Sequence, residues 1–587
     1  MMYQKRLLDV RQALAKQHIK TFWLSGLNTF LQKPYKPNER LLEWVSGFEG
    51  SAGSLLITEQ KAILLTDKRY VEQARHTLDS KIFSVVDSGE VKLENLLLDY
   101  LGPSVSLGFD PWCLSAKSVE QLQLASPHRK LVPLKQSLAE ALSFANTFEE
   151  STQNFFLFNR SEHLVQSALS AIQQTLETRE AFFCGDCCSL SWLLGLRGQT
   201  NSFTPSIEGY GLITKGSLFF WCHKKLVTQE VRSHLEPHVS ILDLKDFKES
   251  FLAASKGLKV LFEPSTTPYA VLAALMREKR TTAAVTSPIV PLQIIKGPKE
   301  LAYLKKAQIK EGIAWAHLLY SIEEAVSAGD SLSEWDVSER LERIRKNDPS
   351  YRGPSFETIA AFGANAAFMH YHPSPEKATA LANNDLFLLD AGGQYMPGAT
   401  TDTTRTILLG KMRDERFARF YTAVLKGFIA YSTLVFPKGT RGIHLESAAR
   451  RFLWDEGADF KHATGHGVGS FLNVHEPPIL SMRDDKIDLK PGMTVTCEPG
   501  YYRQGAFGIR LENMMTVIKT RHADFYTFQQ ETLIPFDHQL IDLKQLTSEE
   551  IQFIDTYHRH VFQTLFPLLT NEHVQEWLRY KTRPLAS

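Results

Sequence analysis

Hydrophobic residues follow two different spacings along the chain. In the first 19 residues, apolar side chains recur among basic ones, which predicts an amphipathic helix leading into a strand. Elsewhere, short apolar runs end at polar or glycine-containing turns, which is typical of β-strands. In the first part of the chain, such runs cover residues 54–58, 62–66 and 104–110, and residues 91–101 have a helical pattern.

The same alternation returns further along the chain. Strand-like runs cover residues 181–185, 210–214, 217–222 and 259–264. There is also a weak internal repeat. Leu-Ile-Thr at 56–58 leads through a strand into a helical pattern at 68–78, and Leu-Ile-Thr at 212–214 leads through a strand into 224–235. These patterns predict two related αβ domains, over residues 1–150 and 151–296.

A third region begins at Lys296-Gly297-Pro298, because proline is tolerated in the first turn of a helix. Two long helical patterns follow, and we expect one further domain over residues 297–587. A chain of 587 residues is too long for one hydrophobic core, so three domains are reasonable. The net charge of +1 gives no reason to expect nucleic acid or an anionic membrane surface as a partner.

Four acidic residues and one histidine in this third region lie beside strand-like runs and glycine-containing turns. They are Asp390, Asp402, His466, Glu498 and Glu512. Together they can hold two hard divalent cations and an activated water, which makes a hydrolytic centre. Oxygen-rich ligation with a single nitrogen suits Mn²⁺ better than a structural zinc site, which prefers cysteine and several histidines.

Residues 507–518 carry two of the polar candidates on one strand-like run. Arg510 and Glu512 alternate with Ile509 and Leu511. A continuous strand would send the two charged residues to one face and the aliphatic residues to the other. Residues 404–409 and 493–497 are rich in β-branched residues and also predict strands.

The sequences of these motifs resemble those of the pita-bread metallopeptidases, and most closely those of the long, three-domain form of the Xaa-Pro aminopeptidase (aminopeptidase P) family. The resemblance is carried by GHGVGSFLNVHE (465–476), EPGYY (498–502) and GAFGIRLEN (505–513). Residues 44–58 and 64–74 resemble the first domain of that family, and 189–198 the second. The tail from about residue 533 resembles its C-terminal extension. The implied fold is α/β (α+β), with two creatinase-like αβ domains followed by a pita-bread catalytic domain.

The resemblance also implies roles. Asp390 would chelate one metal, Asp402 and Glu512 would bridge both, and His466 and Glu498 would complete the second. Glu498 would act as general base and acid. Four further residues match positions around the ligands: His370, His462, His475 and Arg510. His370 and His475 would contact the scissile carbonyl, and all four would bind or position substrate. The expected cofactors are two Mn²⁺ ions, the substrates are peptides with proline at the second position, and the expected assembly is a homodimer.

The chain departs from the family pattern in two places. The stretch between the two aspartates is one residue longer, and the extra residue falls at a Pro-Gly turn (396–399) that a hairpin can absorb. Residues 140–165 do not match the usual link between the first two domains. Among the histidines, His372 is the nearest alternative to His370. His462 and His466 could be a helical zinc pair, but the glycines on both sides of His466 favour a loop or strand edge.

Other interpretations remain open. A prolidase-like dipeptidase would share the same ligands, although the length and the C-terminal extension argue against it. A non-catalytic binding protein on the same fold would be expected to have lost ligands. The six cysteines, including the cluster Cys184, Cys187 and Cys188, are interpreted as free thiols in a reducing compartment. Without a signal-peptide pattern or a transmembrane run, we expect a cytoplasmic protein that does not enter membranes.

Overall fold

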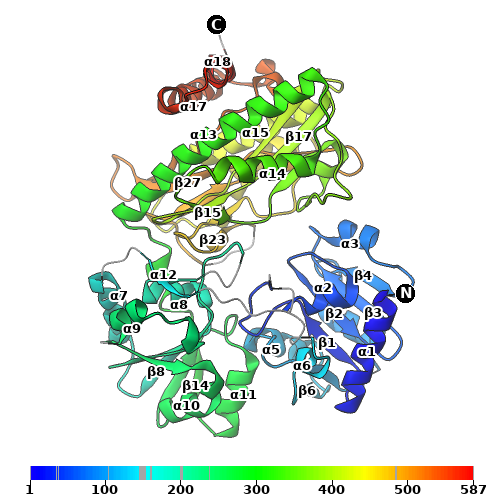
Figure 1. The fold of residues 1–587 in the computed structure, drawn as a ribbon, viewed down its shortest axis with the longest axis vertical. Coiled ribbons are helices and arrows are strands. Elements are labelled where there is room, and N and C mark those ends of the chain that lie inside the picture. Colours follow the sequence, from blue (N-terminus) through cyan, green and yellow to red (C-terminus); the bar gives the residue numbers. More distant parts are fainter. Residues whose placement is uncertain are drawn as a thin grey trace. The chain divides into compact units, whose positions relative to one another are not determined.

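The structure is a computed structural model that divides into two compact units, Met1–Gln293 and Ile294–Ser587 (Figure 1). It describes residues 2–34, 36, 39–102, 105–144, 154–158, 162–198, 202–236, 238–482 and 486–585. The unmatched stretch at 140–165 therefore lies partly outside the described residues. Within the described residues, no helix has both the length and the apolar character needed to cross a membrane.

The first unit contains two six-stranded sheets that share one topology. The first sheet has the order β4-β3-β2-β1-β5-β6 and the second has the order β12-β11-β10-β8-β13-β14. In each, the central strand pairs antiparallel with one neighbour and parallel with the other. The prediction of two related αβ domains is therefore confirmed. The strands are β1 (Phe22–Ser25), β2 (Gly53–Ile57), β3 (Ala62–Thr66), β4 (Phe83–Asp87), β5 (Leu107–Phe109) and β6 (Leu131–Pro133), then β8 (Glu180–Cys184), β10 (Tyr210–Thr214), β11 (Leu218–Cys222), β12 (Val239–Asp243), β13 (Lys259–Phe262) and β14 (Thr282–Ala284).

The strands of the first sheet are apolar on both faces because helices cover both faces. Phe22 and Leu24 of β1 pack into a core with the helix α1 (Met2–Lys16). Trp23, between them, packs into a second core with α4 (Leu93–Tyr100) and α5 (Ala116–Ala125). Successive side chains of a strand point to opposite faces, so a doubly covered strand is an uninterrupted apolar run.

The second unit is built on a long helix, α13 (Pro298–Ala328), which begins at the predicted proline. The backbone N–H of Gly297 donates to Glu300 Oε2 at 2.9 Å and caps this helix. The shorter α14 (Glu334–Arg345) follows. The C-terminal helices α17 (Ser548–Leu565) and α18 (Glu572–Lys581) lie beside α13 (Figure 1). Trp577 Nε1 and Lys581 Nζ both contact the Glu323 carboxylate, at 3.0 and 2.8 Å. The C-terminal extension is therefore packed onto α13.

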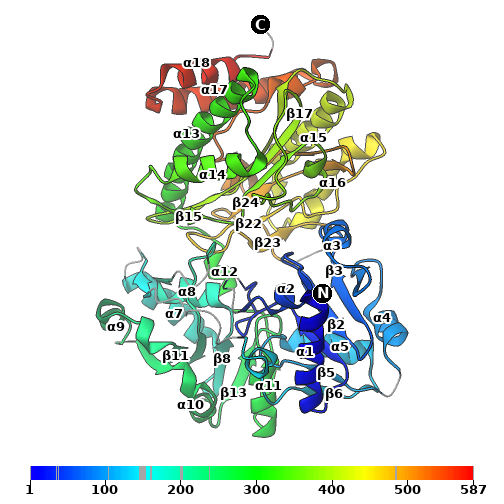
Figure 2. The ribbon, with the colours of Figure 1, turned by 45° about the vertical axis from the view of Figure 1, so that its right-hand side comes forward.

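Several small sheets make up the rest of the second unit. Its strands are β15 (Tyr351–Pro354), β18 (Gly393–Tyr395) and β19 (Ala399–Thr400) in one sheet, β16 (Ile359–Phe362), β17 (Asn384–Asp390) and β20 (Thr404–Gly410) in another, β25 (Gly500–Arg503) with β26 (Phe507–Arg510), and a six-stranded sheet of β21 (Phe436–Pro437), β28 (Phe525–Gln530), β27 (Asn513–Lys519), β24 (Thr494–Cys497), β22 (Gly465–Gly467) and β23 (Glu476–Leu480). The helices α15 (Arg416–Ser432) and α16 (Gly442–Asp455) pack against each other on this unit (Figure 2). The strands predicted at 404–409 and before Glu498 are confirmed. The turn predicted between the two aspartates joins β18 to β19.

The continuous strand predicted through residues 507–518 is wrong. β26 ends at Arg510, β27 begins at Asn513, and the two strands belong to different sheets. The backbone between them turns to other partners. Leu511 N donates to Pro499 O at 3.2 Å, and Glu512 N donates to Thr404 O at 3.1 Å. The convergence of Arg510 and Glu512 therefore comes from a chain crossing between sheets and not from alternation along one strand.

Candidate metal centre

Three of the five predicted residues form a compact buried cluster. Ligand atoms of Asp402, His466 and Glu512 all lie within 4.8 Å of one another, so this cluster could hold a metal ion. His466 Nε2 is 3.4 Å from Asp402 Oδ2 and 3.8 Å from Glu498 Oε1. His466 Nδ1 lies 2.9 Å from the carbonyl oxygen of Gly467, which can only accept. Nδ1 therefore carries a hydrogen, and Nε2 faces the carboxylates.

The five residues reach this place from the ends of separate elements. Asp390 ends β17, Asp402 lies between β19 and β20, and His466 is the middle residue of β22. Glu498 follows β24, and its N–H donates to Thr464 O at 2.7 Å. Glu512 lies between β26 and β27. The position of His466 on a short strand agrees with the prediction that it is not part of a helical pair with His462.

Asp390 offers an open ligand atom. Its Oδ2 accepts a hydrogen bond from Arg510 Nη2 at 2.5 Å. Its Oδ1 is buried and has no hydrogen-bond partner among the described residues. A buried polar atom without a partner is costly, and a cation would satisfy it. Four carboxylates, one of them with this unpartnered oxygen, and one imidazole are a donor set that fits hard divalent cations.

The pKa values of three carboxyl groups and of the imidazole in this cluster are raised, so the cluster favours bound positive charge. Burial raises the pKa of Asp390 to about 6, although Arg510 opposes the rise. Burial likewise raises the pKa of Glu498 to about 7, against the effect of His466. Burial and then Asp402 raise the pKa of Glu512 well above its usual value. Burial alone would lower the pKa of His466, but Asp402 and Glu498 outweigh it and raise the pKa to about 9. Without a cation, these raised pKa values favour the protonated forms of these carboxyl groups and of His466.

Arg510 belongs to a directed chain of hydrogen bonds. Its Nη1 donates to Tyr502 OH at 3.0 Å, and Tyr502 OH lies 2.8 Å from His462 Nε2. His462 Nδ1 lies 2.7 Å from the carbonyl oxygen of Ala463 and so carries the hydrogen, which leaves Nε2 to accept from Tyr502. The chain thus runs from Asp390 through Arg510 and Tyr502 to His462.

Tyr502 and Thr404 were missed in the sequence analysis. In the β25–β26 pair, Gly500 stands opposite Arg510, so Tyr502 is the diagonal neighbour of Arg510. The EPGYY motif with its adjoining strand could have suggested this contact. Thr404 Oγ1 donates to Glu512 Oε2 at 2.7 Å and accepts from Arg510 Nε at 3.1 Å. No local signal in the sequence distinguishes Thr404 from the threonines beside it.

The two remaining histidines, His475 and His370, come from different segments of the second unit. The ring of His475 packs edge-on against that of His466, with 4.3 Å between centroids and 65° between planes. His370 is half-buried and follows the short helix η5 (Gly363–Ala367). This helix lies directly against β26, since a Cβ added to Gly508 would be 1.8 Å from Ala366 O. His372 Nε2 lies 4.0 Å from a carboxylate oxygen of Glu357.

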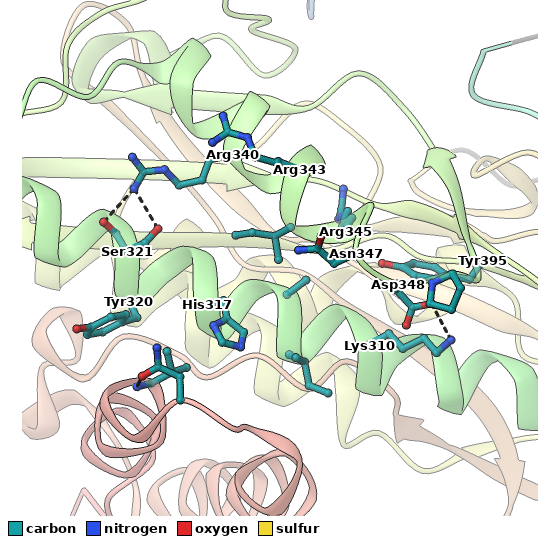
Figure 3. Close-up of a pocket in the computed structure, with 16 residues that line it drawn as sticks. Lys310, His317, Tyr320, Ser321, Arg340, Arg343, Arg345, Asn347, Asp348 and Tyr395 are labelled. Atoms are coloured by element: carbon teal, nitrogen blue, oxygen red, sulfur yellow. Dashed lines mark hydrogen bonds and ion pairs between the residues drawn. The ribbon is translucent and has the colours of Figure 1, made fainter.

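A second buried network holds the loop between the two aspartates. Arg345 donates to Glu311 Oε2 through Nε (3.2 Å) and Nη2 (2.8 Å), and to Gly392 O through Nη1 (3.0 Å). Thr401 Oγ1, next to Asp402, donates to Glu311 Oε1 at 2.8 Å. Arg345 also lines a cavity of about 740 Å³ between α13, α14 and the start of α18 (Figure 3). The metal-site loop is therefore anchored to both long helices.

The cysteine cluster of the first unit is separate from this chemistry. Cys184, Cys187 and Cys188 are all buried, and Cys184 and Cys187 are free thiols. Burial raises the pKa of Cys184 and Cys187, so their thiolates are disfavoured at neutral pH.

Comparison with known proteins identifies the family to which the chain belongs. The model of metallopeptidase family M24 matches residues 302–519, and the model of its C-terminal region matches 524–585. Two creatinase/prolidase N-terminal domain models match residues 6–141 and 155–300. The matches therefore extend over both units.

Full-length relatives agree with these models. The chain is 32% identical to the human Xaa-Pro aminopeptidase 2 over 603 residues, covering 99% of this chain and 89% of that protein. It is also 32% identical to a probable Xaa-Pro aminopeptidase P of Laccaria bicolor, covering 99% and 93%. The crystal structure of the Caenorhabditis elegans X-prolyl aminopeptidase, described as a cytosolic enzyme with a di-nuclear active site, superimposes with a TM-score of 0.92 at 25% identity, with full coverage of both chains.

The prolidase of Thermococcus sibiricus shares the fold over only 64% of this chain, with a TM-score of 0.51 and 23% identity. The full-length relatives described above are named as Xaa-Pro aminopeptidases. With two creatinase-type N-terminal domains, a pita-bread catalytic domain and the C-terminal region in one chain, the protein belongs to metallopeptidase family M24, among the long relatives of Xaa-Pro aminopeptidase.

Proposed function

We propose that the protein is a dinuclear metal-dependent aminopeptidase that hydrolyses the bond between an N-terminal residue and a following proline. The observation that carries the proposal is a cluster of four carboxylates and one imidazole. In this cluster one oxygen of Asp390 has no hydrogen-bond partner among the described residues, and the pKa values of Asp390 and Glu498 are raised. The names of the full-length relatives support the specificity.

Two divalent cations, Mn²⁺ in preference, would be held by the five residues in the roles expected from the sequence. Asp390 would bind one ion, Asp402 and Glu512 both, and His466 and Glu498 the other. When bound, the ions supply Lewis acidity that lowers the pKa of water and polarises the scissile carbonyl. Arg510 and Thr404 would keep Asp390 and Glu512 oriented through the hydrogen bonds described above.

Proton transfer would be carried out by Glu498. Its carboxylate would accept a proton from the attacking water and deliver it to the nitrogen of the departing peptide. His475, packed against His466, and His370 would donate to the carbonyl oxygen as negative charge develops there. His462 and Arg510 would position the substrate, and Tyr502 would keep these two side chains in register.

Preference for proline would arise from shape. The proline nitrogen carries no hydrogen and the ring fixes φ near −65°, so a site for this bond needs no acceptor for an amide proton. A free α-amine facing the carboxylates would restrict cleavage to the first peptide bond.

A peptide panel tests the proposal. With added Mn²⁺, Xaa-Pro-Yaa should lose one N-terminal residue, whereas N-acetylated Xaa-Pro-Yaa and Xaa-Ala-Yaa should react with a kcat/KM lower by orders of magnitude. Cleavage products are identified by mass spectrometry. Equal cleavage of Xaa-Ala-Yaa would make this a general aminopeptidase. Cleavage of the dipeptide Xaa-Pro in preference to the tripeptide would favour the prolidase-like alternative, and no cleavage with two metals bound would favour a non-catalytic role.

The division into domains at residues 150 and 296, a homodimeric assembly and a cytoplasmic location belong to the same proposal. The family-model boundaries are compatible with the division. The C. elegans relative, described as cytosolic, supports the location. The general prevalence of two-fold oligomers supports a dimer. Light scattering of the purified protein tests the dimer.

A further inference from the structure

A buried carboxylate outside the metal centre binds the segment that carries His370. Glu334, the first residue of α14, has no exposed surface. Among the described residues it has no ion-pair partner. Its Oε1 instead accepts hydrogen bonds from Phe362 N at 2.6 Å and Asn365 Nδ2 at 2.9 Å. Its Oε2 accepts from Tyr371 OH and Thr379 N, both at 2.7 Å, and from Asn365 Nδ2 at 3.2 Å.

An ionised carboxylate is the group that this place requires. Each of the contacting groups donates a hydrogen, and a carboxylate is the side-chain group that only accepts. A charge buried without a partner is ordinarily costly. Here charge-assisted hydrogen bonds and the amino-terminal end of α14 compensate it. The Glu334 side chain therefore makes all of the hydrogen bonds described above to one segment of the chain.

All these contacts lie between residues 362 and 379, which we call the His370 segment. One contact, Tyr371, is the residue next to His370. The segment also packs against β26, where Gly508 leaves no space for a side chain beside Ala366. β26 ends at Arg510, which binds Asp390. The His370 segment is thus fixed between Glu334 and the strand that contributes to the metal centre.

We propose that Glu334 is a positioning residue that holds His370 in its working place beside the metal centre. This inference rests on the proposed function, because it assigns Glu334 to the support of one of that site's groups. Glu334 itself does not touch substrate in this scheme. Its effect on the reaction passes through His370.

The Glu334→Gln variant tests the inference with almost no change in volume. Whichever way the new amide turns, its NH₂ group faces a backbone N–H, of Phe362 or of Thr379, which then loses its acceptor. We expect kcat/KM for Xaa-Pro-Yaa to fall at least tenfold, with two metals still bound. Asp336→Asn is the matched control. Asp336 lies two residues further along α14, caps the helix through Ser333 and makes no hydrogen bond to the described residues 362–379.

A double-mutant cycle with His370→Ala separates positioning from general damage. If Glu334 acts through His370, the double variant should be no slower than His370→Ala alone. Multiplicative losses, or a Glu334→Gln variant as active as Asp336→Asn, would overturn the inference. If Glu334→Gln does not fold, Tyr371→Phe removes a single donor and should cause a smaller loss that also disappears in the His370→Ala background. Its persistence there would equally overturn the inference.

Amide hydrogen exchange keeps this inference distinct from the proposed function. In Glu334→Gln, amides of residues 362–379 should exchange at least tenfold faster than in Asp336→Asn, and the remainder of the second unit should be unchanged. Unchanged exchange in the His370 segment contradicts the inference even if the wild-type protein is an Xaa-Pro aminopeptidase. A wild-type protein that cleaves no Xaa-Pro-Yaa contradicts the proposed function, whatever the exchange result.

Discussion

Removing the metal should make the second unit less stable as the pH rises from about 5 to 9. In the metal-free protein the pKa is about 6 for Asp390, about 7 for Glu498 and about 9 for His466, each above its ordinary value. Across this range the folded state therefore binds more protons than the unfolded state. Under that condition the free energy of unfolding falls as the pH rises. The stabilisation that comes from these raised pKa values is fully present at low pH. It is lost as the pH rises through the folded-state pKa values.

The size of the effect follows from the shifts. Asp390 shifts from 3.8, Glu498 from 4.5 and His466 from 6.5, so each changes by two units or more. One unit corresponds to about 1.4 kcal/mol, so between pH 5 and 9 Glu498 and His466 should each lose roughly 3 kcal/mol, and Asp390, whose shift lies mostly below pH 5, about 1.4 kcal/mol. Asp390 and His466 are buried and are screened little by solvent, whereas the half-buried Glu498 is screened more. Native proteins are stable by only about 5–15 kcal/mol, so the loss should be large.

Scanning calorimetry of a verified metal-free preparation, at pH 5, 7 and 9, measures this loss as a falling Tm. A Mn²⁺-loaded sample at each pH provides the comparison. Metal binding needs deprotonated ligands, so the difference in Tm between loaded and metal-free protein should widen with pH. In Glu498→Gln one titrating group is removed, and the slope of the metal-free Tm should become shallower. A metal-free Tm that is flat or rises from pH 5 to 9 would refute the reasoning.

Three other variants address the site and its support. Glu498→Gln should lower kcat by several orders of magnitude while metals remain bound. Glu531→Gln, the same change at a more deeply buried glutamate that accepts a hydrogen bond from Thr516, should keep normal turnover; near-normal turnover in Glu498→Gln would mean that the proton acceptor is elsewhere. Asp402→Asn should lose bound metal, measured by elemental analysis, and retention of two ions would argue against bridging. Tyr557→Phe removes an acceptor of Arg405 Nη2 at 2.9 Å and should cost about 1–3 kcal/mol in urea unfolding, and an unchanged midpoint would remove Tyr557 from the support of the site.

Local patterns were sufficient to predict much of the architecture. Apolar runs located the more central strands of the two sheets of the first unit, because helices cover both faces there, but missed edge strands such as β4 and β12. A weak Leu-Ile-Thr repeat predicted the repeated domain that the shared strand order confirms. Carboxylates at strand ends indicated which residues would converge, since strand ends bring distant segments together. The roles of these residues as ligands stay a prediction.

The supporting contacts could not be predicted in the same way. Thr404 and Arg510 are more than 100 residues apart in the chain, as are Arg405 and Glu512. Such contacts depend on tertiary packing that no period of two or 3.6 residues encodes. The break between Arg510 and Asn513 was missed for the same reason, because alternation along a strand says nothing of which sheet the strand joins.

The hydrogen bonds of Arg405 have a consequence for the order in which the parts of the site form during synthesis of the chain. Its guanidinium donates to Glu512 O at 2.7 Å and, on its other side, to Ile534 O and Tyr557 OH. A ribosome releases these later residues only after Glu512 has been made. Until they arrive, Arg405 lacks part of its bonding, and the backbone that carries Glu512 lacks its final support. Stable metal uptake should therefore be an event that follows synthesis of the C-terminal helices, so that unfinished chains would emerge without a working hydrolytic centre.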